Sequence, residues 1–210
     1  MPYDVDNDPY IDSATGILRN LLGVRTSQNL DEAEAGITAI EIANLTIADP
    51  PFYEDFNLEQ LKSIHRQLFG VIYDWAGELR TVEISKGTTS FARVEYLNSS
   101  LVSLFEQLKN DEYLMTTDFD EFISLLAHYY GELIVIHPFR EGNGRVIRTF
   151  LAMLAESIGW HIAWDEMNAQ ENIDASIAAY NGDEKPLQLM LEKFVTPIDV
   201  FWGRDPYEFI

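Results

Sequence analysis

The stretch HPFREGNGRVIR, residues 137–148, constrains the fold more than any other part of the sequence. His137 closes an apolar segment with helical periodicity, and Pro138 ends that helix because a proline disfavours helical geometry in the residue before it. Two glycines flank Asn143 directly before the next periodic segment. The sequence therefore predicts two helices joined by a short loop that turns tightly.

This loop gathers positive charge in an acidic chain of 210 residues, which has 35 acidic and 14 basic side chains and a net charge of -21. The glycines around Asn143 let successive backbone N–H groups turn inward at the positive end of the following helix dipole, where they can bind an anion. Arg145 and Arg148 lie three residues apart on one face of that helix and can clamp two phosphates of one ligand. The loop is thus a predicted phosphate-binding site.

Three further residues of the stretch add chemistry. His137 is suited to act as a general base, since the pKa of an unperturbed imidazole lies near neutrality. Glu141 can hold Mg²⁺ against phosphate oxygens, because hard carboxylate ligands suit that ion. Phe139 is apolar where an exposed loop has no need of an apolar side chain. Each feature alone is commonly structural, but their conjunction arises by chance at a rate on the order of 10⁻⁸.

Most of the chain reads as helical, and 47% apolar residues are enough for one compact domain. Helical periodicity, with Asn57 as the cap of the second segment, predicts helices over residues 31–46, 58–75, 98–109, 118–136, 144–158 and 167–180. Residues 79–94 alternate in polarity around a turn and predict a β-hairpin. The expected fold is mainly α with a small β-hairpin.

The composition of the chain argues against several kinds of site, location and binding partner. The sequence has no cysteine, so disulfides and thiolate metal sites are excluded. The acidic first residues carry no secretory signal, and no apolar run is long enough to span a membrane. The negative charge repels nucleic acid and anionic membranes. We expect a cytoplasmic protein that binds neither nucleic acid nor membrane. Whether the acidic surface serves solubility or a basic partner stays open.

The stretch is similar to the complete motif of the Fic family, His-x-Phe-x-Asp/Glu-Gly-Asn-Gly-Arg-x-x-Arg, with every specified position filled. The similarity extends through DWAGELRTVEISKGTTSF and NDPYID, and covers about residues 8–195. The resemblance implies a Fic domain over residues 1–196, followed by a tail of unassigned role at 197–210. It also implies a helical core with a β-hairpin flap over the active site.

The family's usual reaction transfers AMP from ATP to a Tyr, Ser or Thr hydroxyl of a target protein and releases pyrophosphate. By resemblance, His137 is the base, Phe139 anchors the loop in the core, and Glu141 ligates Mg²⁺. The remaining motif residues bind phosphates: Gly142, Asn143 and Gly144 through backbone N–H groups with help from the Asn143 amide, and Arg145 and Arg148 at the β and γ phosphates. The cofactor is Mg²⁺ and the nucleotide substrate is ATP.

The flap is expected to dock an extended segment of the target by main-chain hydrogen bonding, which makes little demand on sequence. The candidate docking residues are Val82, Glu83, Ile84, Ser85, Lys86, Gly87, Thr88 and Thr89. A solvent-exposed turn explains Lys86 and Thr89 about as well as contact with target or nucleotide.

Many Fic proteins carry an inhibitory helix with the pattern Ser/Thr-x-x-x-Glu-Gly/Asn. The nearest match is TDFDEF at residues 117–122, and its Glu121 falls inside a predicted core helix. We therefore expect a separate small antitoxin that supplies a glutamate to Arg148. The chain then resembles the toxin of a bacterial toxin–antitoxin pair, with an effector translocated into another cell as the alternative.

The sequence leaves alternative substrates and functions to be considered. Another nucleotide can replace ATP, because base contacts lie outside the motif. Phosphotransferring relatives replace the second glycine by lysine, and Gly144 argues against that reaction. A nonenzymatic binding module is the alternative of another class, and His137 argues against it. The other histidines, His65, His128 and His161, are expected to be structural.

Overall fold

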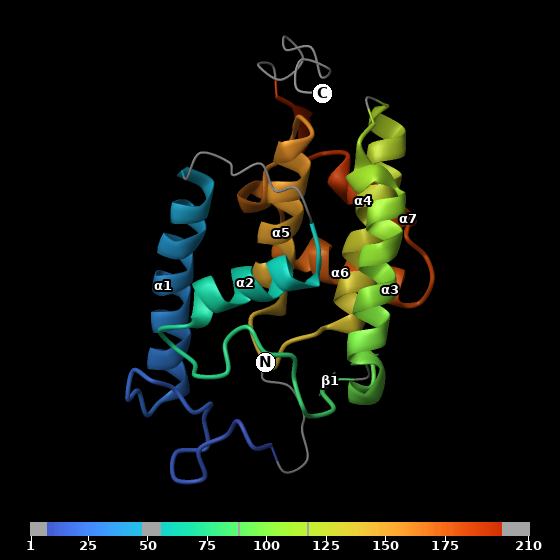
Figure 1. The fold of residues 1–210 in the computed structure, drawn as a ribbon. Coiled ribbons are helices and arrows are strands. Elements are labelled where there is room, and N and C mark those ends of the chain that lie inside the picture. The colour runs from blue at the N-terminus through green and yellow to red at the C-terminus, as the bar shows by residue number, and fades with distance from the viewer. Residues whose placement is uncertain (1–7, 48–55, 88, 117, 199–210) are drawn as a thin grey trace.

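The computed structural model describes residues 8–47, 56–87, 89–116 and 118–198 (Figure 1). Its helices are α1 (Ser27–Ile47), α2 (Leu58–Phe69), α3 (Leu97–Asn110), α4 (Phe119–Ile136), α5 (Asn143–Ser157), α6 (Ala169–Tyr180) and α7 (Lys185–Leu191). Its strands are β1 (Ser85–Lys86), β2 (Thr89–Ser90), β3 (Trp160–Ile162) and β4 (Val195–Pro197). The prediction of a mainly helical fold with a small β-hairpin is confirmed.

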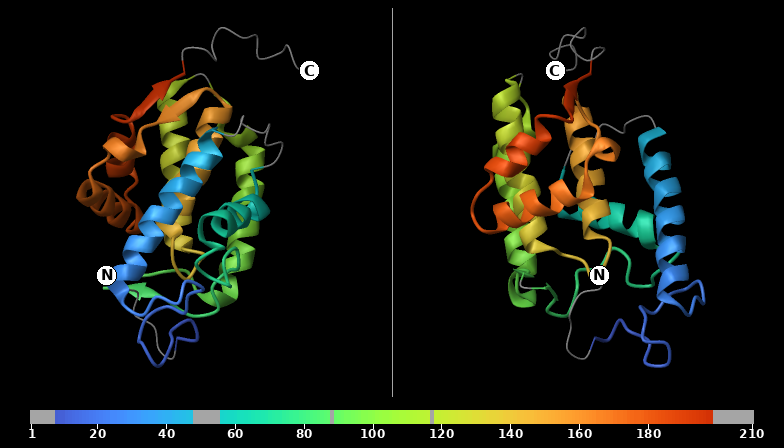
Figure 2. Two further views of the ribbon diagram at one scale, coloured as in Figure 1. Left: turned by 90° about the vertical axis from the view of Figure 1, so that its left-hand side faces the viewer. Right: turned by 180° about the vertical axis from the view of Figure 1, so that it is seen from behind.

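Helices α4 and α5 form the centre of the fold. Helix α4 packs against α3, α5, α6 and α7, while α5 also packs against α2. Helix α2 crosses the front of this bundle in Figure 1, and Figure 2 shows α6 and α7 on the opposite side. The buried face of α5 carries Val146, Ile147, Phe150, Leu151 and Leu154. This arrangement fixes the loop between α4 and α5 at one end of the molecule.

The ends of α4 follow from local chemistry. Asp118 caps the helix by accepting a hydrogen bond of 2.9 Å from the backbone N–H of Glu121. Glu121 therefore belongs to the first turn of α4, as the sequence indicates, and Thr116 donates to its carboxylate. The helix stops at His137, which adopts the left-handed conformation directly before Pro138.

Helix α2 is shorter than the predicted segment 58–75. It ends at Phe69, and the backbone N–H of the capping residue Gly70 donates to the carbonyl of Arg66 at 2.8 Å. Ile72 and Tyr73 are buried in the turns that follow. Because these turns also face their apolar residues inward, periodicity alone could not locate the end of the helix.

The β structure also differs from the prediction. The hairpin at 79–94 is regular only over β1 and β2, and the pairing of β3 with β4 was not predicted. Strands of three residues are too short to show alternation, and their pairing is distant in sequence. The first residues of the predicted tail join this second sheet, since Ile198 donates to the carbonyl of Gly159 at 2.9 Å. Residues 199–210 of the tail lie outside the described residues.

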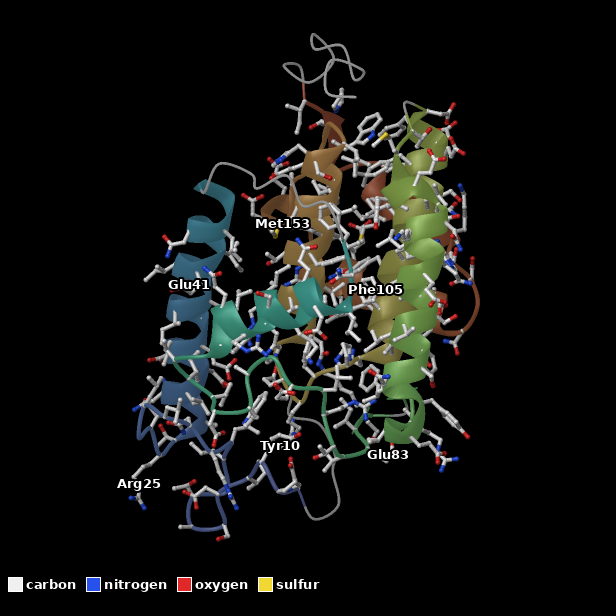
Figure 3. The ribbon with its side chains drawn as sticks, in the orientation of Figure 1. Tyr10, Arg25, Glu41, Glu83, Phe105 and Met153 are labelled. Atoms are coloured by element: carbon white, nitrogen blue, oxygen red, sulfur yellow. The ribbon has the colours of Figure 1, made fainter. Side chains whose placement is uncertain are left out.

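The segment that precedes α1 lies along the end of the molecule that carries the α4–α5 loop. Tyr10 and Glu83, labelled in Figure 3, lie at this end. The hydroxyl of Tyr10 accepts a hydrogen bond of 3.1 Å from the backbone N–H of Thr81. In the part of the chain that the structure describes, no helix has the length and apolar character needed to cross a membrane.

Candidate active site

His137 lies at the bend between α4 and the loop, with φ 51° and ψ 65°. Its Nδ1 lies 3.0 Å from the carbonyl oxygen of Ile134. Since a carbonyl can only accept, this contact assigns the hydrogen to Nδ1 and the lone pair to Nε2. The ring stacks on Phe91 with centroids 3.8 Å apart. The imidazole is thus held in the tautomer that a general base needs.

Burial lowers the pKa of His137 to about 3, with smaller contributions in the same direction from the charges of Arg80 and Lys86. The hydrogen bond to the carbonyl of Ile134 opposes this shift. The side chain is consequently neutral at physiological pH. The neutral imidazole has the lone pair of Nε2 available to accept a proton, while its burial makes it a weaker base than an exposed histidine.

The loop after His137 is braced by Asn143. The side-chain oxygen of Asn143 accepts from the backbone N–H of Phe139, and its side-chain nitrogen donates to the carbonyl of Phe139, both at 2.8 Å. Asn143 is buried, and these two hydrogen bonds hold the loop. They use one of the two hydrogens on the side-chain nitrogen, so the help of this amide in holding a phosphate stays a prediction.

Phe139 is fully buried and stacks on His65, with ring centroids 4.0 Å apart. His65 Nδ1 accepts from the backbone N–H of Gly77 at 2.8 Å, which leaves its Nε2–H to donate to the carbonyl of Glu141 at 3.1 Å. Burial lowers the pKa of His65 to about 4. His65 is a neutral structural histidine that supports the loop from the core side.

Helix α5 begins with a glycine that the local geometry requires. Gly142 has φ 80°, and a Cβ at this position would lie 2.3 Å from Cζ of Phe69. The following backbone N–H groups, at Asn143, Gly144 and Arg145, start a helix and have no acceptor within it. No hydrogen bond from them to another described residue is present. These amides line a cavity, where they can bind an anion.

Glu141 lies beside these amides. One of its carboxylate oxygens accepts from the backbone N–H of Gly142 at 2.9 Å and lies 3.9 Å from Nη2 of Arg145. Burial raises the pKa of the Glu141 carboxyl above its usual value. Within the described ranges, no group of three or more His, Cys, Asp or Glu side chains could hold a metal ion. A lone carboxylate beside a phosphate site does fit Mg²⁺, which takes its other ligands from phosphate and water.

The two motif arginines have different surroundings. Arg145 forms an ion pair with Glu34 of α1, lies 3.4 Å from the hydroxyl of Thr38, and packs over the ring of Phe69. Of the two arginines predicted to clamp phosphates, Arg145 is therefore ion-paired within the fold, and Arg148 has no acidic partner among the residues that the structure describes.

A cavity of about 460 Å³ lies beside the loop and the start of α5. The motif contributes His137, Glu141, Gly142, Asn143, Gly144, Arg145 and Arg148 to its wall. Helix α6 contributes Asn172, Ile173, Ser176, Ile177 and Tyr180, none of which was assigned a role from the sequence. Ile173 and Ile177 are 48% and 47% exposed and lie one turn apart on α6, so they present apolar surface at the cavity wall.

The flap covers one side of the cavity. Lys86, Thr89 and Phe91 line it, because Lys86 pairs with Thr89 and alternate residues of a strand share a face. Val82, Glu83 and Ile84 anchor the base of the hairpin: Val82 accepts from Arg80, Glu83 accepts from the backbone N–H of Val94, and Ile84 is buried. Ser85, Lys86, Gly87 and Thr89 form the tip, and Thr88 lies outside the described residues.

Arg80 joins the flap to the catalytic loop, and the sequence did not reveal it. The buried guanidinium donates to the carbonyls of His137 at 2.9 Å and Val82 at 2.7 Å, and also to that of Ala92. A lone arginine at the edge of a predicted strand is ordinarily exposed. Its carbonyl partners come from three separate segments, so only the folded structure identifies it.

Comparison with known proteins places this arrangement in a family. The model of the Fic/DOC family matches residues 55–155. The chain is 35% identical over 189 residues to the probable protein adenylyltransferase Fic of Escherichia coli, covering 90% of this chain and 92% of that protein. The chain therefore belongs to the Fic/DOC family.

Two further relatives bear on the site. The chain is 36% identical to the protein adenylyltransferase VbhT of Bartonella schoenbuchensis over 94% of its length, but spans only 41% of that protein. It also superposes, with a TM-score of 0.86 and 26% identity, on the N-terminal Fic domain of a VirB-translocated Bep effector from Bartonella quintana solved with bound ADP. That match covers 93% of this chain and 98% of the other.

Proposed function

We propose that this chain is a protein adenylyltransferase, which transfers AMP from ATP to a hydroxyl side chain of a target protein. The observation that carries the proposal is the shared cavity: the neutral ring of His137, the amides at the start of α5 and the side chain of Arg148 all line it. The relatives named as protein adenylyltransferases support the same activity.

In the proposed reaction, Nε2 of His137 takes the proton of the target hydroxyl as the hydroxyl oxygen bonds to the α phosphorus of ATP. The bond between that phosphorus and the bridging oxygen breaks, and pyrophosphate leaves with the bond's electron pair. The backbone N–H groups of Asn143 and Gly144 hold phosphate oxygens, and the side chain of Arg148 binds the γ-phosphate end of the triphosphate. Glu141 holds Mg²⁺, which supplies neutralisation of phosphate charge. Catalysis then consists mainly of positioning and charge stabilisation.

The nucleobase is proposed to lie against α6. Ile173 and Ile177 offer exposed apolar surface on the cavity wall. Asn172 accepts a hydrogen bond of 2.9 Å from the hydroxyl of Tyr130, so its side-chain amide nitrogen is left to donate. Adenine presents ring nitrogens that accept hydrogen bonds, which suits this donor, and ATP is the proposed substrate.

The target is proposed to add to the β1 edge of the flap. Phe91 donates to the carbonyl of Ile84, so the pair Ser85–Ser90 next to it directs its backbone groups away from the hairpin. On the β2 side, the hydroxyl of Tyr180 already donates to the carbonyl of Ser90 at 2.8 Å. The backbone of Ser85 is therefore the edge that an extended segment can pair with.

Regulation is proposed to come from another chain. Arg148 lacks a carboxylate partner in the described part of the chain, and Glu121 lies in the first turn of α4, apart from the cavity-lining residues. A small antitoxin that places a glutamate on Arg148 would block the far end of the triphosphate. The protein is then a bacterial toxin that acts in the cytoplasm. Its catalytic domain is proposed to span residues 1–196. The structural similarity to a VirB-translocated effector of Bartonella quintana supports translocation as the alternative setting.

The activity is tested by incubating the protein with Mg²⁺, ATP labelled at the α phosphate and a bacterial lysate. We expect label on a lysate protein, and none with the His137→Ala variant. His161→Ala is the matched control, since His161 is an exposed histidine remote from the cavity wall. Equal labelling by wild type and His137→Ala would refute the proposal.

A further inference from the structure

Helix α1 contributes to the active site through a buried carboxylate. We propose that Glu34 is a positioning residue that holds the guanidinium of Arg145 in place, so that Arg145 acts as a fixed charge and Arg148 as the adaptable phosphate ligand. This inference rests on the proposed adenylyl transfer. It assigns a role to α1, which the motif does not include.

Glu34 lies on the inner stripe of α1. Leu30, Glu34 and Thr38 follow one another at one-turn spacing, and all three are buried. One carboxylate oxygen of Glu34 accepts from Nη2 of Arg145, while the hydroxyl of Tyr73 donates to the other oxygen. Both oxygens are thereby engaged, and the side chain of Glu34 is only 8% exposed. A buried carboxylate with two partners is a rigid support.

The contacts of Arg145 leave its guanidinium little freedom. The Nη1 atom of Arg145 lies 3.4 Å from the hydroxyl oxygen of Thr38, and its Cζ atom lies 4.7 Å from the centroid of the Phe69 ring. A planar group held by an anion at one edge and an aromatic ring on one face keeps a single orientation. Arg145 still lines the cavity, so the fixed group faces the place where the triphosphate would bind.

The surrounding charge distinguishes the two arginines. Arg145 lies between Glu34 and Glu141, and the latter is 3.9 Å away, so two anions surround one cation. Its charge is therefore largely balanced before a nucleotide arrives. The attraction for the triphosphate falls on Arg148 and on the amides of the loop. A charge already oriented toward the reacting phosphates requires no reorganisation during the reaction, which favours the transition state over the ground state.

The test compares Glu34→Gln with Glu32→Gln. The two residues lie on the same helix and the substitutions remove the same charge, but Glu32 is exposed. AMP transfer from α-labelled ATP to lysate protein is measured over a range of ATP concentrations. For Glu34→Gln we expect kcat to fall by about 10-fold or more, because a misplaced group can cost up to ~100-fold, with KM for ATP unchanged within about twofold. Glu32→Gln should match the wild type.

A double-mutant cycle shows whether Glu34 acts through Arg145. In an Arg145→Gln background, Glu34→Gln should change kcat by less than about twofold, because the group that it positions is gone. An equal fall in both backgrounds would overturn the inference. So would a folded Glu34→Gln protein with the kcat of the wild type.

A second variant covers the case in which Glu34→Gln does not fold. Tyr73→Phe keeps the carboxylate and removes only the hydroxyl that orients it. We expect a smaller fall in kcat with KM for ATP unchanged, and an unchanged kcat would contradict the inference. A wild-type protein that transfers no label contradicts the proposed function itself, whereas normal transfer by all variants contradicts the role of Glu34 alone.

Discussion

Arg140 donates two hydrogen bonds, of 2.8 and 2.5 Å, to one carboxylate oxygen of Asp8, and both side chains are almost fully buried. The pair ties the segment before α1 to the loop that carries His137. Arg140 occupies a position that the family motif leaves unspecified, and its burial excludes contact with a target protein. Its role is to hold the loop.

Removing the Asp8 carboxylate should loosen this connection. For Asp8→Ala we expect a loss of about 1.5–3 kcal/mol in the free energy of unfolding, the usual cost of losing hydrogen bonds to a charged group. Urea unfolding measures the change. Asp31→Ala, at an exposed position of α1, is the control and should change stability by less than about 0.5 kcal/mol. Equal stability of the two variants would contradict the structural role of the pair.

The two buried histidines should make the fold sensitive to acid. The pKa is lowered to about 4 for His65 and to about 3 for His137, and both side chains titrate near 6.5 in the unfolded chain. Their contribution to stability is present above about pH 6.5 and is lost as the pH falls from there toward 3, because only the unfolded chain then binds these protons.

Urea unfolding at several pH values between 7 and 4 tests this dependence. A His65→Gln variant should be less stable at pH 7 but should lose less stability than the wild type on acidification. An unchanged slope in His65→Gln would show that His65 is not buried as a neutral group.

The low pKa of His137 also predicts the pH dependence of transfer. Because burial keeps the imidazole neutral down to about pH 3, the rate should not rise with the titration of a group near pH 6.5. The measurement is kcat/KM for ATP between pH 5.5 and 8, a range chosen to bracket the ordinary histidine pKa of about 6.5. A rise tenfold per pH unit below about 6.5 would show that His137 titrates at its ordinary value.

The glycines of the loop should differ in the effect of a methyl group. Gly142→Ala places Cβ against the Phe69 ring in a backbone of positive φ, and we expect a loss of about 2 kcal/mol or more in stability. The added Cβ of Gly144→Ala meets the guanidinium group of Arg148, with Nη1 the nearest atom at 3.2 Å. This variant should fold normally but bind ATP about 10-fold more weakly, because a displacement of Arg148 worth ~1.4 kcal/mol suffices. Thermal unfolding and calorimetric titration with ATP separate the two effects.

Substitutions of the two motif arginines should also differ in whether they weaken ATP binding or lower thermal stability. Arg148→Ala is expected to reduce ATP affinity by about 10- to 100-fold, the equivalent of ~1.5–3 kcal/mol, with little change in the unfolding temperature. Arg145→Ala leaves the buried Glu34 without its cation and should lower that temperature markedly. Equal thermal shifts in the two variants would contradict the division of roles.

The position of the motif loop between two helices could be predicted, because its proline and glycines are local signals. His137, Phe139 and Gly142 lie where their order along the chain implies, between a helix end and a helix start. What the sequence could not reveal are the partners brought in from elsewhere. Glu34 and Arg80 are charged residues in segments whose local pattern gives no reason for burial. They are buried because they bind partners that are distant in the sequence, and the spacing of apolar residues along the chain carries no information about such partners.

Dependence on long-range packing also explains why the α6 residues of the cavity wall could not be predicted. The helix over 167–180 was predicted, but nothing in its sequence indicated that Asn172 and Ile177 would face the motif loop. The orientation of α6 follows from its packing on α4 and α7, which is a long-range property. Helix positions could be predicted here, whereas the faces that meet at the site could not.

The most direct test of the account follows both ends of ATP at once. ATP labelled at the α phosphate with one isotope and at the γ phosphate with another is incubated with Mg²⁺, the wild-type protein and lysate. We expect more α label on protein in the wild-type reaction than in a matched His137→Ala reaction in the same lysate, with pyrophosphatase inhibited, and an equal excess of γ label in released pyrophosphate. An excess of γ label on protein in the wild-type reaction, with no excess of α label, would contradict AMP transfer.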